Sequence, residues 1–142
     1  TMPIFKVFND MNELKFELKK KIDAYYNDFI LAHLDKNNYL YTMSFAYIDF
    51  AIKEKNLFGA LFVNEFIKTR SIEEVVHSAW NRETIEYSAQ QFGITIKESE
   101  ILYRDIRFYT HGIATQIYGG NMALKEEENQ TLLKNAINKF LK

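Results

Sequence analysis

The sequence is rich in aromatic residues, and their number and spacing favour the binding of an apolar or aromatic small molecule. Phe, Tyr and Trp make up 15% of the 142 residues. Small-molecule sites are lined mostly by apolar side chains, with a few polar groups that orient the ligand. Any one of these residues is explained as simply by core packing, so the prediction concerns the set. We predict that the wall includes members of Tyr47, Phe50, Phe62, His77, Trp80, Tyr87 and Tyr109.

A short motif, Glu74-Val-Val-His77, matches the Glu-x-x-His pattern of di-iron carboxylate proteins. Such a site requires a second copy of the motif and two further inward glutamates. Neither His33 nor His111 follows a glutamate by three residues, and Glu74 also suits a capping box with Ser71. A helical-bundle metalloenzyme is therefore kept as an alternative, while the main prediction includes no metal, cofactor or catalytic residue. No Ser-His-Asp order or phosphate-binding loop stands out, so we do not expect an enzyme.

The composition narrows the class of protein further. The chain has no cysteine, which excludes disulfides and thiolate metal sites. Its formal net charge is -1, and Lys19–Lys21 is the only short basic run, so the body of the chain is not expected to hold DNA. No apolar run reaches the roughly 20 residues of a membrane span, and residues 1–14 lack the layout of a signal peptide. We expect a cytoplasmic protein without membrane contact.

The elements that must position these residues are predicted to be helices. Proline occurs once, at Pro3, and only five residues are glycine. Possible capping boxes begin at Asp10, Ser71 and Thr95, each followed three residues later by glutamate. We predict an all-α fold of about six helices with short connections.

Apolar spacing indicates where these helices run. The first starts near Asp10 and carries the stripe Leu14, Leu18, Ile22, Tyr25 and Phe29. The second, over residues 40–52, is apolar on two sides and should lie in the middle of the domain. A short helix follows over residues 57–62, and a continuation to Phe66 and Ile67 is left open. One helix is then expected from Ile72 to the stop at Gly93, another after Thr95 to Gly119, and a last one over residues 132–141.

Both ends of the chain resemble regulators of the tetracycline-repressor (TetR) family. Ile4-Phe5, Phe8, Asp10, Glu13 and Leu14 are in register with the junction between the recognition helix and the connecting helix. The segment 108–114, Phe-Tyr-Thr-His-Gly-Ile-Ala, is similar to an aromatic-x-x-His-Gly stretch in the penultimate helix of that family. The middle and the C-terminus are similar in helix order.

This resemblance implies a division of the chain and a mechanism. Residues 1–9 would be the remnant of a helix-turn-helix, with Lys6 as a possible DNA phosphate contact, although Phe5 and Met11 replace the usual Tyr and Lys. Residues 10–142 would bind a small molecule and dimerise. A ligand would shift the connecting helix, residues 10–33, which positions the DNA-binding head. Operator DNA would be a partner only of the full-length protein, because the preceding helices are absent here.

The last two helices have apolar side chains on more than one face, which either other helices of the same chain cover or a partner subunit covers. A two-fold four-helix interface would bury these side chains, and the homodimer is expected to use Ile101, Phe108, Gly112, Leu133, Ile137 and Phe140. Gly112 in the middle of a helix would permit a close helix crossing. A dimeric adaptor domain without a ligand is the remaining alternative.

Overall fold

The computed structural model describes residues 10–64 and 69–142. Within these ranges the chain forms seven α-helices, one short 3-10 helix and no β-strand, so the prediction of an all-α fold is confirmed. No helix in the described ranges is long and apolar enough to cross a membrane. The helices are α1 (Met11–Leu31), η2 (Lys36–Asn38, 3-10), α2 (Tyr39–Lys53), α3 (Lys55–Phe62), α4 (Ile72–Val76), α5 (Ala79–Phe92), α6 (Ile96–Tyr118) and α7 (Glu126–Phe140).

Local sequence signals explain where several helices begin and end. The Asp10 carboxylate accepts the Glu13 backbone N–H at 2.8 Å and caps α1. Ser71 and Thr95 form reciprocal capping boxes at the starts of α4 and α6, as predicted. Gly93 ends α5 in the left-handed conformation at φ 63°, which glycine adopts without steric cost.

The segment between Ser71 and Gly93 differs from its prediction, because it forms two helices instead of one. Ser78 is extended, with φ -60° and ψ 136°, and it separates α4 from α5. The buried Asn81 side chain donates to the Val75 carbonyl at 2.7 Å, so a carbonyl at the end of α4 finds its partner outside the helix. Apolar spacing continues across this break, and for this reason periodicity alone did not reveal it.

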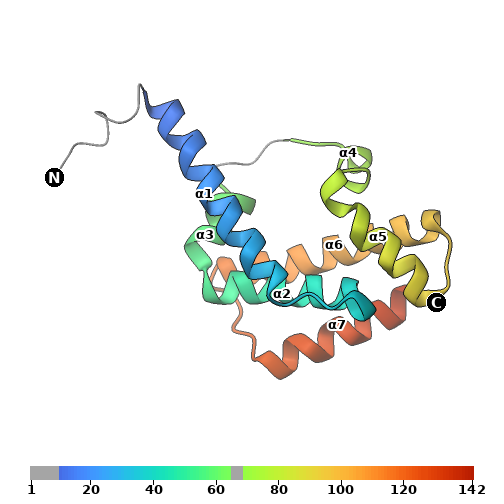
Figure 1. Ribbon diagram of the computed structural model, residues 1–142. Coiled ribbons are helices and arrows are strands. Elements are labelled where there is room, and N and C mark those ends of the chain that lie inside the picture. Colours follow the sequence, from blue (N-terminus) through green and yellow to red (C-terminus); the bar gives the residue numbers. More distant parts are fainter. Residues whose placement is uncertain (1–9, 65–68) are drawn as a thin grey trace.

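Helices α2 and α6 form the centre of the molecule (Figure 1). α2 packs against α1, α3, α5, α6 and α7, as the two-sided apolar pattern predicted. Phe50 on one side of α2 joins the core beneath α1 and α3, whereas Ile48 on another joins α6 and α7. The two faces of α2 therefore belong to two different parts of the core.

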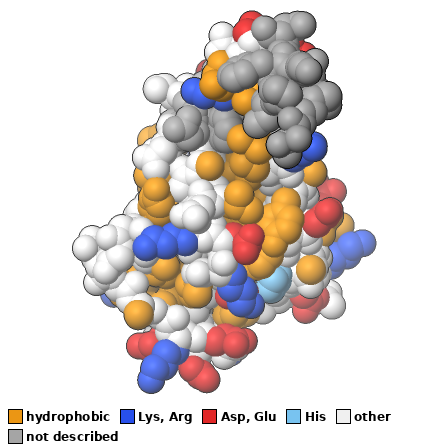
Figure 2. Space-filling view, turned by 90° about the vertical axis from the view of Figure 1, so that its left-hand side faces the viewer, with side chains coloured by type: hydrophobic (Ala, Val, Ile, Leu, Met, Phe, Trp, Pro, Cys, Tyr) orange, Lys and Arg blue, Asp and Glu red, His pale blue; other side chains and the backbone are white. Residues whose placement is uncertain are grey.

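Helix α1 is anchored mainly through its C-terminal half. Its buried residues are Ile22, Tyr26 and Ile30, which follow one another at four-residue spacing. The predicted stripe was wrong at Leu18 and Tyr25, which are about half exposed. The face of the molecule drawn in Figure 2 shows apolar side chains at the surface among charged ones. The first turns of α1 thus contribute little to the core, and the helix reaches outward from the body (Figure 1).

Candidate ligand-binding pocket

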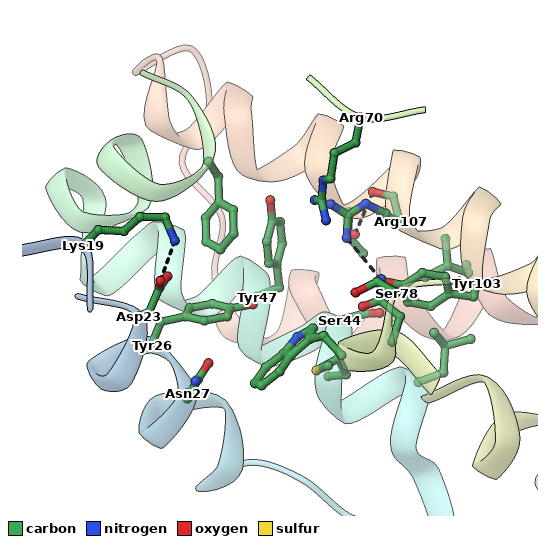
Figure 3. A pocket seen from close by; sticks show the side chains of 17 residues that line it. Lys19, Asp23, Tyr26, Asn27, Ser44, Tyr47, Arg70, Ser78, Tyr103 and Arg107 are labelled. Atoms are coloured by element: carbon green, nitrogen blue, oxygen red, sulfur yellow. Dashed lines mark hydrogen bonds and ion pairs between the residues drawn. The ribbon is translucent and has the colours of Figure 1, made fainter. Parts of the chain in front are cut away.

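A half-open pocket of about 420 Å³ lies between α1 and the central helices (Figure 3). This volume is within the range of small-molecule sites, about 300–1,000 Å³. The side chains come from α1, α2, α3, the loop before α4, the start of α5, and α6. The lining consists of Lys19, Asp23, Tyr26, Asn27, Leu40, Met43, Ser44, Tyr47, Phe62, Arg70, Ser78, Trp80, Asn81, Tyr103, Ile106, Arg107 and Thr110.

Aromatic rings form one part of this wall. The Phe62 ring contacts Tyr26 edge-on at a centroid distance of 5.0 Å and lies 5.1 Å from Tyr47 at a tilt. Trp80, at the start of α5, also lines the pocket but remains 51% exposed. A ligand with a flat apolar part would meet ring faces and edges here, which stabilise aromatic groups beyond simple area burial.

Three tyrosine hydroxyls contribute to the polarity of the pocket. Burial raises the pKa of Tyr26, Tyr47 and Tyr103, because the phenolate would lose its hydration. These side chains therefore stay protonated near neutral pH and keep an O–H group that can donate a hydrogen bond.

Tyr47 and His111 form a hydrogen bond from α2 to α6. The distance from the Tyr47 hydroxyl oxygen to His111 Nδ1 is 2.6 Å. Burial lowers the pKa of His111, and the nearby positive charge of Arg107 lowers it further. A neutral imidazole can accept through Nδ1, so we assign the donor role to the tyrosine.

The charged groups of the pocket are an ion pair on α1 and two arginines. Lys19 Nζ and Asp23 Oδ2 on α1 lie 2.6 Å apart and neutralise one another. Arg107 on α6 donates to the Tyr103 hydroxyl at 3.2 Å. Neither Arg107 nor Arg70, just before α4, makes an ion pair with an acidic residue in the described part of the chain.

The seven predicted ligand-binding residues are dispersed by the fold. Tyr47, Phe62 and Trp80 line the pocket. Phe50 is fully buried in the core beneath α1, Tyr109 is partly buried against the core between α6 and α7, and Tyr87 stacks on Tyr39 at 5.1 Å. His77 lies at the surface, 3.2 Å from Glu73 and 3.6 Å from Glu100.

Sequence reasoning missed Tyr26, Tyr103 and both arginines. Tyr26 follows Ile22 by four residues, but the stripe was drawn through its neighbour Tyr25. Arg107 follows Tyr103 by four residues and adjoins the inward-facing Ile106, so a charge beside an apolar stripe was the available signal. Arg70 lies in a connection between helices, where apolar periodicity gives no information.

The predicted dimer-interface residues lie in different environments. Leu133 and Ile137 are buried within the chain, so their side chains offer nothing to a partner. Ile101, Phe108 and Phe140 are exposed, and Phe108 borders a groove beside α4. A Cβ added at Gly112 would meet nothing within 4 Å, so no close crossing within the chain requires this glycine. Lys6, the predicted DNA contact, lies outside the described residues, as do all of 1–9 and the helix continuation left open at Phe66 and Ile67.

The two residues of the Glu-x-x-His motif, Glu74 and His77, make polar contacts with backbone groups at the two ends of α4. Glu74 Oε2 accepts the Ser71 backbone N–H at 2.8 Å and so completes the capping box. His77 Nδ1 lies 3.0 Å from the Glu73 carbonyl oxygen. In the ranges 10–64 and 69–142 no group of three or more His, Cys, Asp or Glu side chains could hold a metal ion. These contacts give the di-iron alternative no geometric support.

Comparisons of the chain with protein-family models, curated proteins and solved structures found no match.

Proposed function

We propose that this chain is the ligand-sensing and dimer-forming part of a transcriptional regulator of the TetR type. The observation that carries the proposal is the pocket of about 420 Å³ whose wall is shared by α1 and the central helices. Support also comes from the all-helical fold and from the sequence resemblance at both ends of the chain. On this proposal the bound molecule acts as an effector and undergoes no reaction.

The pocket is arranged so that a ligand would act on α1. Lys19, Asp23, Tyr26 and Asn27 of α1 face the same cavity as Tyr47 of α2 and Arg107 of α6. A ligand that bridges these helices stabilises the α1 position in which all its contacts are made. Because α1 is anchored by its C-terminal half, a small tilt there displaces its N-terminal end, which would carry the DNA-binding head.

The binding step can be tested with the neutral fluorescent probe N-phenyl-1-naphthylamine, titrated into the 142-residue chain. We expect saturable binding at one site and a rise in thermal stability. Trp80→Ala should weaken the binding without unfolding the chain, because this side chain is already half exposed. Phe16→Ala is the matched control, since Phe16 is an exposed aromatic residue that does not line the pocket. Equal loss in both variants, or no binding, would contradict the proposal.

The switching step requires a distance measurement. The chain has no cysteine, so Asn12→Cys and Asn135→Cys introduce unique sites for two spin labels on exposed positions of α1 and α7. A saturating probe should change the distance between the labels or narrow its distribution. Saturable binding with an unchanged distribution would show a binding domain without a movable α1.

Dimerisation would use apolar side chains that the single chain leaves exposed. Phe108 on α6 is 58% exposed and Phe140 on α7 is 43% exposed. We expect sedimentation velocity to find a dimer, and Phe108→Ser or Phe140→Ser to shift it toward monomer. Lys139→Ser is the control because it changes an exposed polar residue on α7. A monomer at all concentrations would contradict this part of the proposal.

A further inference from the structure

Arg70 and Arg107 bring two positive charges into one corner of the pocket. They are 37 positions apart in the sequence, yet both line the main pocket and the smaller cavity of about 100 Å³ beside it. Both charges act on the same phenol, lowering the pKa of Tyr103 against the effect of burial. Figure 3 shows both side chains reaching the pocket, Arg70 from the loop before α4 and Arg107 from α6.

This pair of charges has no acidic counterpart among the described residues. The one carboxylate of the pocket lining, Asp23, lies 2.6 Å from Lys19 and is neutralised there. Two neighbouring guanidinium groups repel one another, and solvent screens part of this repulsion here because Arg70 is exposed and Arg107 is only half-buried. By contrast, Arg104 on the same helix is paired with Asp105 at 2.9 Å. The two arginines without an acidic partner among the described residues are thus the ones that line the main pocket, whereas Arg104 lines only the smaller cavity.

A bound anion would balance the two positive charges of Arg70 and Arg107. Guanidinium groups bind carboxylate or phosphate oxygens through paired, charge-assisted hydrogen bonds. The O–H group of Tyr103 and the hydroxyl of Ser78 lie in the same lining and can add hydrogen bonds. Beyond the arginines, Tyr47, Phe62 and Trp80 provide an aromatic surface for the rest of the molecule.

We propose that the pocket recognises a small organic anion, whose acidic group is held by Arg70 and Arg107 and whose apolar or aromatic body lies against Tyr47, Phe62 and Trp80. This inference rests on the proposed function, since it names the chemical class of the effector. From the sequence we expected only an apolar or aromatic ligand. We now expect that ligand to carry a negative charge at one end. The size of the pocket restricts the ligand to a small molecule.

Two fluorescent probes test the requirement for charge. 8-Anilinonaphthalene-1-sulfonate carries the same ring system as N-phenyl-1-naphthylamine and adds one sulfonate, so the pair isolates the contribution of the negative group. Both are titrated into the wild-type chain and into Arg70→Gln, Arg107→Gln and Arg104→Gln. The last is the matched control, because Arg104 is on α6, is paired with Asp105 and lines only the smaller cavity, not the main pocket. Circular dichroism confirms that each variant is folded.

We expect the wild type to bind the sulfonate about tenfold or more tightly than the neutral probe, as charge-assisted hydrogen bonds imply. Arg70→Gln and Arg107→Gln should each lower the affinity for the sulfonate far more than the affinity for the neutral probe, and so remove most of this preference. Arg104→Gln should alter neither affinity. Competition against the sulfonate then distinguishes a carboxylate site from a phosphate site. A carboxylate site is displaced more readily by 2-naphthoate, a phosphate site by 2-naphthyl phosphate, and neither by the neutral 2-naphthamide.

The outcomes separate the two proposals. The anion inference would be overturned, with the ligand pocket left intact, by the following result. The wild type, Arg70→Gln and Arg107→Gln bind both probes with the same affinity, and Trp80→Ala binds neither. A preference for the sulfonate that falls equally in Arg104→Gln would also overturn it, because the preference would then not depend on the two arginines of the main pocket. Failure of both probes to bind the folded wild type would overturn the pocket together with the inference.

Discussion

The two sides of the central α2–α6 pair are built from different residues. On the side of α7, the buried members of the core are all aliphatic, namely Ile48, Ile113, Ile117 and Leu133, and the rings that pack against them, Tyr41, Phe45 and Tyr109, are only partly buried. On the side of α1 and α3, the core is aromatic, with Phe50 and Phe58 fully buried and Tyr47 and Phe62 packed against them. The pocket opens beside this aromatic side and is lined by Arg70 and Arg107, which have no acidic partner among the described residues.

This contrast indicates a division of labour within one small domain. Branched aliphatic side chains interdigitate and exclude voids, so the α7 side can provide stability. The α1 side combines aromatic rings with tyrosine hydroxyls and adjoins the pocket, so it can hold a ligand. Changes on the α7 side should therefore affect mainly the free energy of unfolding, and changes around the pocket should affect mainly binding.

The largest effect on stability is expected at Leu133, which is 0% exposed in the α7 cluster. Leu133→Ala should lower the free energy of unfolding by about 2–5 kcal/mol, because it removes buried methyl groups and leaves a cavity. Urea unfolding followed by circular dichroism measures the loss. Phe140→Ala, on the exposed end of the same helix, should change stability by about 0.5 kcal/mol or less at concentrations where the chain is monomeric. Similar losses in both variants would remove the distinction between a packed interior and an exposed face of α7.

A smaller loss is expected where α3 meets the end of α6. A Cβ at Gly59 would lie 2.6 Å from the Tyr118 ring, so the ring or the helix must move. Overpacking costs about 1–3 kcal/mol and the helix preference of alanine offsets about 1 kcal/mol of it, so Gly59→Ala should cost up to about 2 kcal/mol. Gly112→Ala is the control, since its Cβ meets nothing within 4 Å and alanine favours a helix by about 1 kcal/mol over glycine. Stabilisation by both substitutions would show that α3 is loosely held.

The hydrogen bond between Tyr47 and His111 should contribute less. Tyr47→Phe keeps the ring but removes the donor, and we expect a loss of about 0.5–1.5 kcal/mol in the free energy of unfolding. Tyr87→Phe is the matched control, because the Tyr87 hydroxyl makes no hydrogen bond within the described residues. A larger loss in the control would mean that the α2–α6 bond is not made in solution.

The smallest effect concerns pH. The folded-state pKa of His111 is lowered from its ordinary value of 6.5, so the unfolded chain binds more protons near that pH. The unfolding free energy should therefore fall as pH drops through about 6.5 and level off below the lowered pKa. His111→Gln should reduce this slope between pH 7.5 and 5, since glutamine can still accept from Tyr47 and does not titrate there. Identical slopes in the wild type and in His111→Gln would show that burial against Tyr47 and Phe58 and the charge of Arg107 do not lower the pKa of His111.

The sequence predicted the helices well because their signals are local. Capping at Asp10, Ser71 and Thr95 and the stop at Gly93 depend on residues within one turn of each other. The break at Ser78 was missed because its partner contact, Asn81 to Val75, becomes evident only once the two helices have separated. The shift of the α1 stripe was missed for a related reason, since Tyr25 and Tyr26 suit the same helix equally well.

The sequence by itself determined an all-helical chain, its two-sided α2, and a supply of aromatic rings sufficient for a pocket wall. Only the tertiary structure decided which rings line the cavity, and that Arg70 and Arg107 meet there without an acidic partner in the described chain. The physical reason is range: caps and amphipathic stripes act over a few residues, whereas a pocket arises where five helices and a loop leave space between them. Positions far apart in the sequence acquire a common role only when packing brings their side chains together.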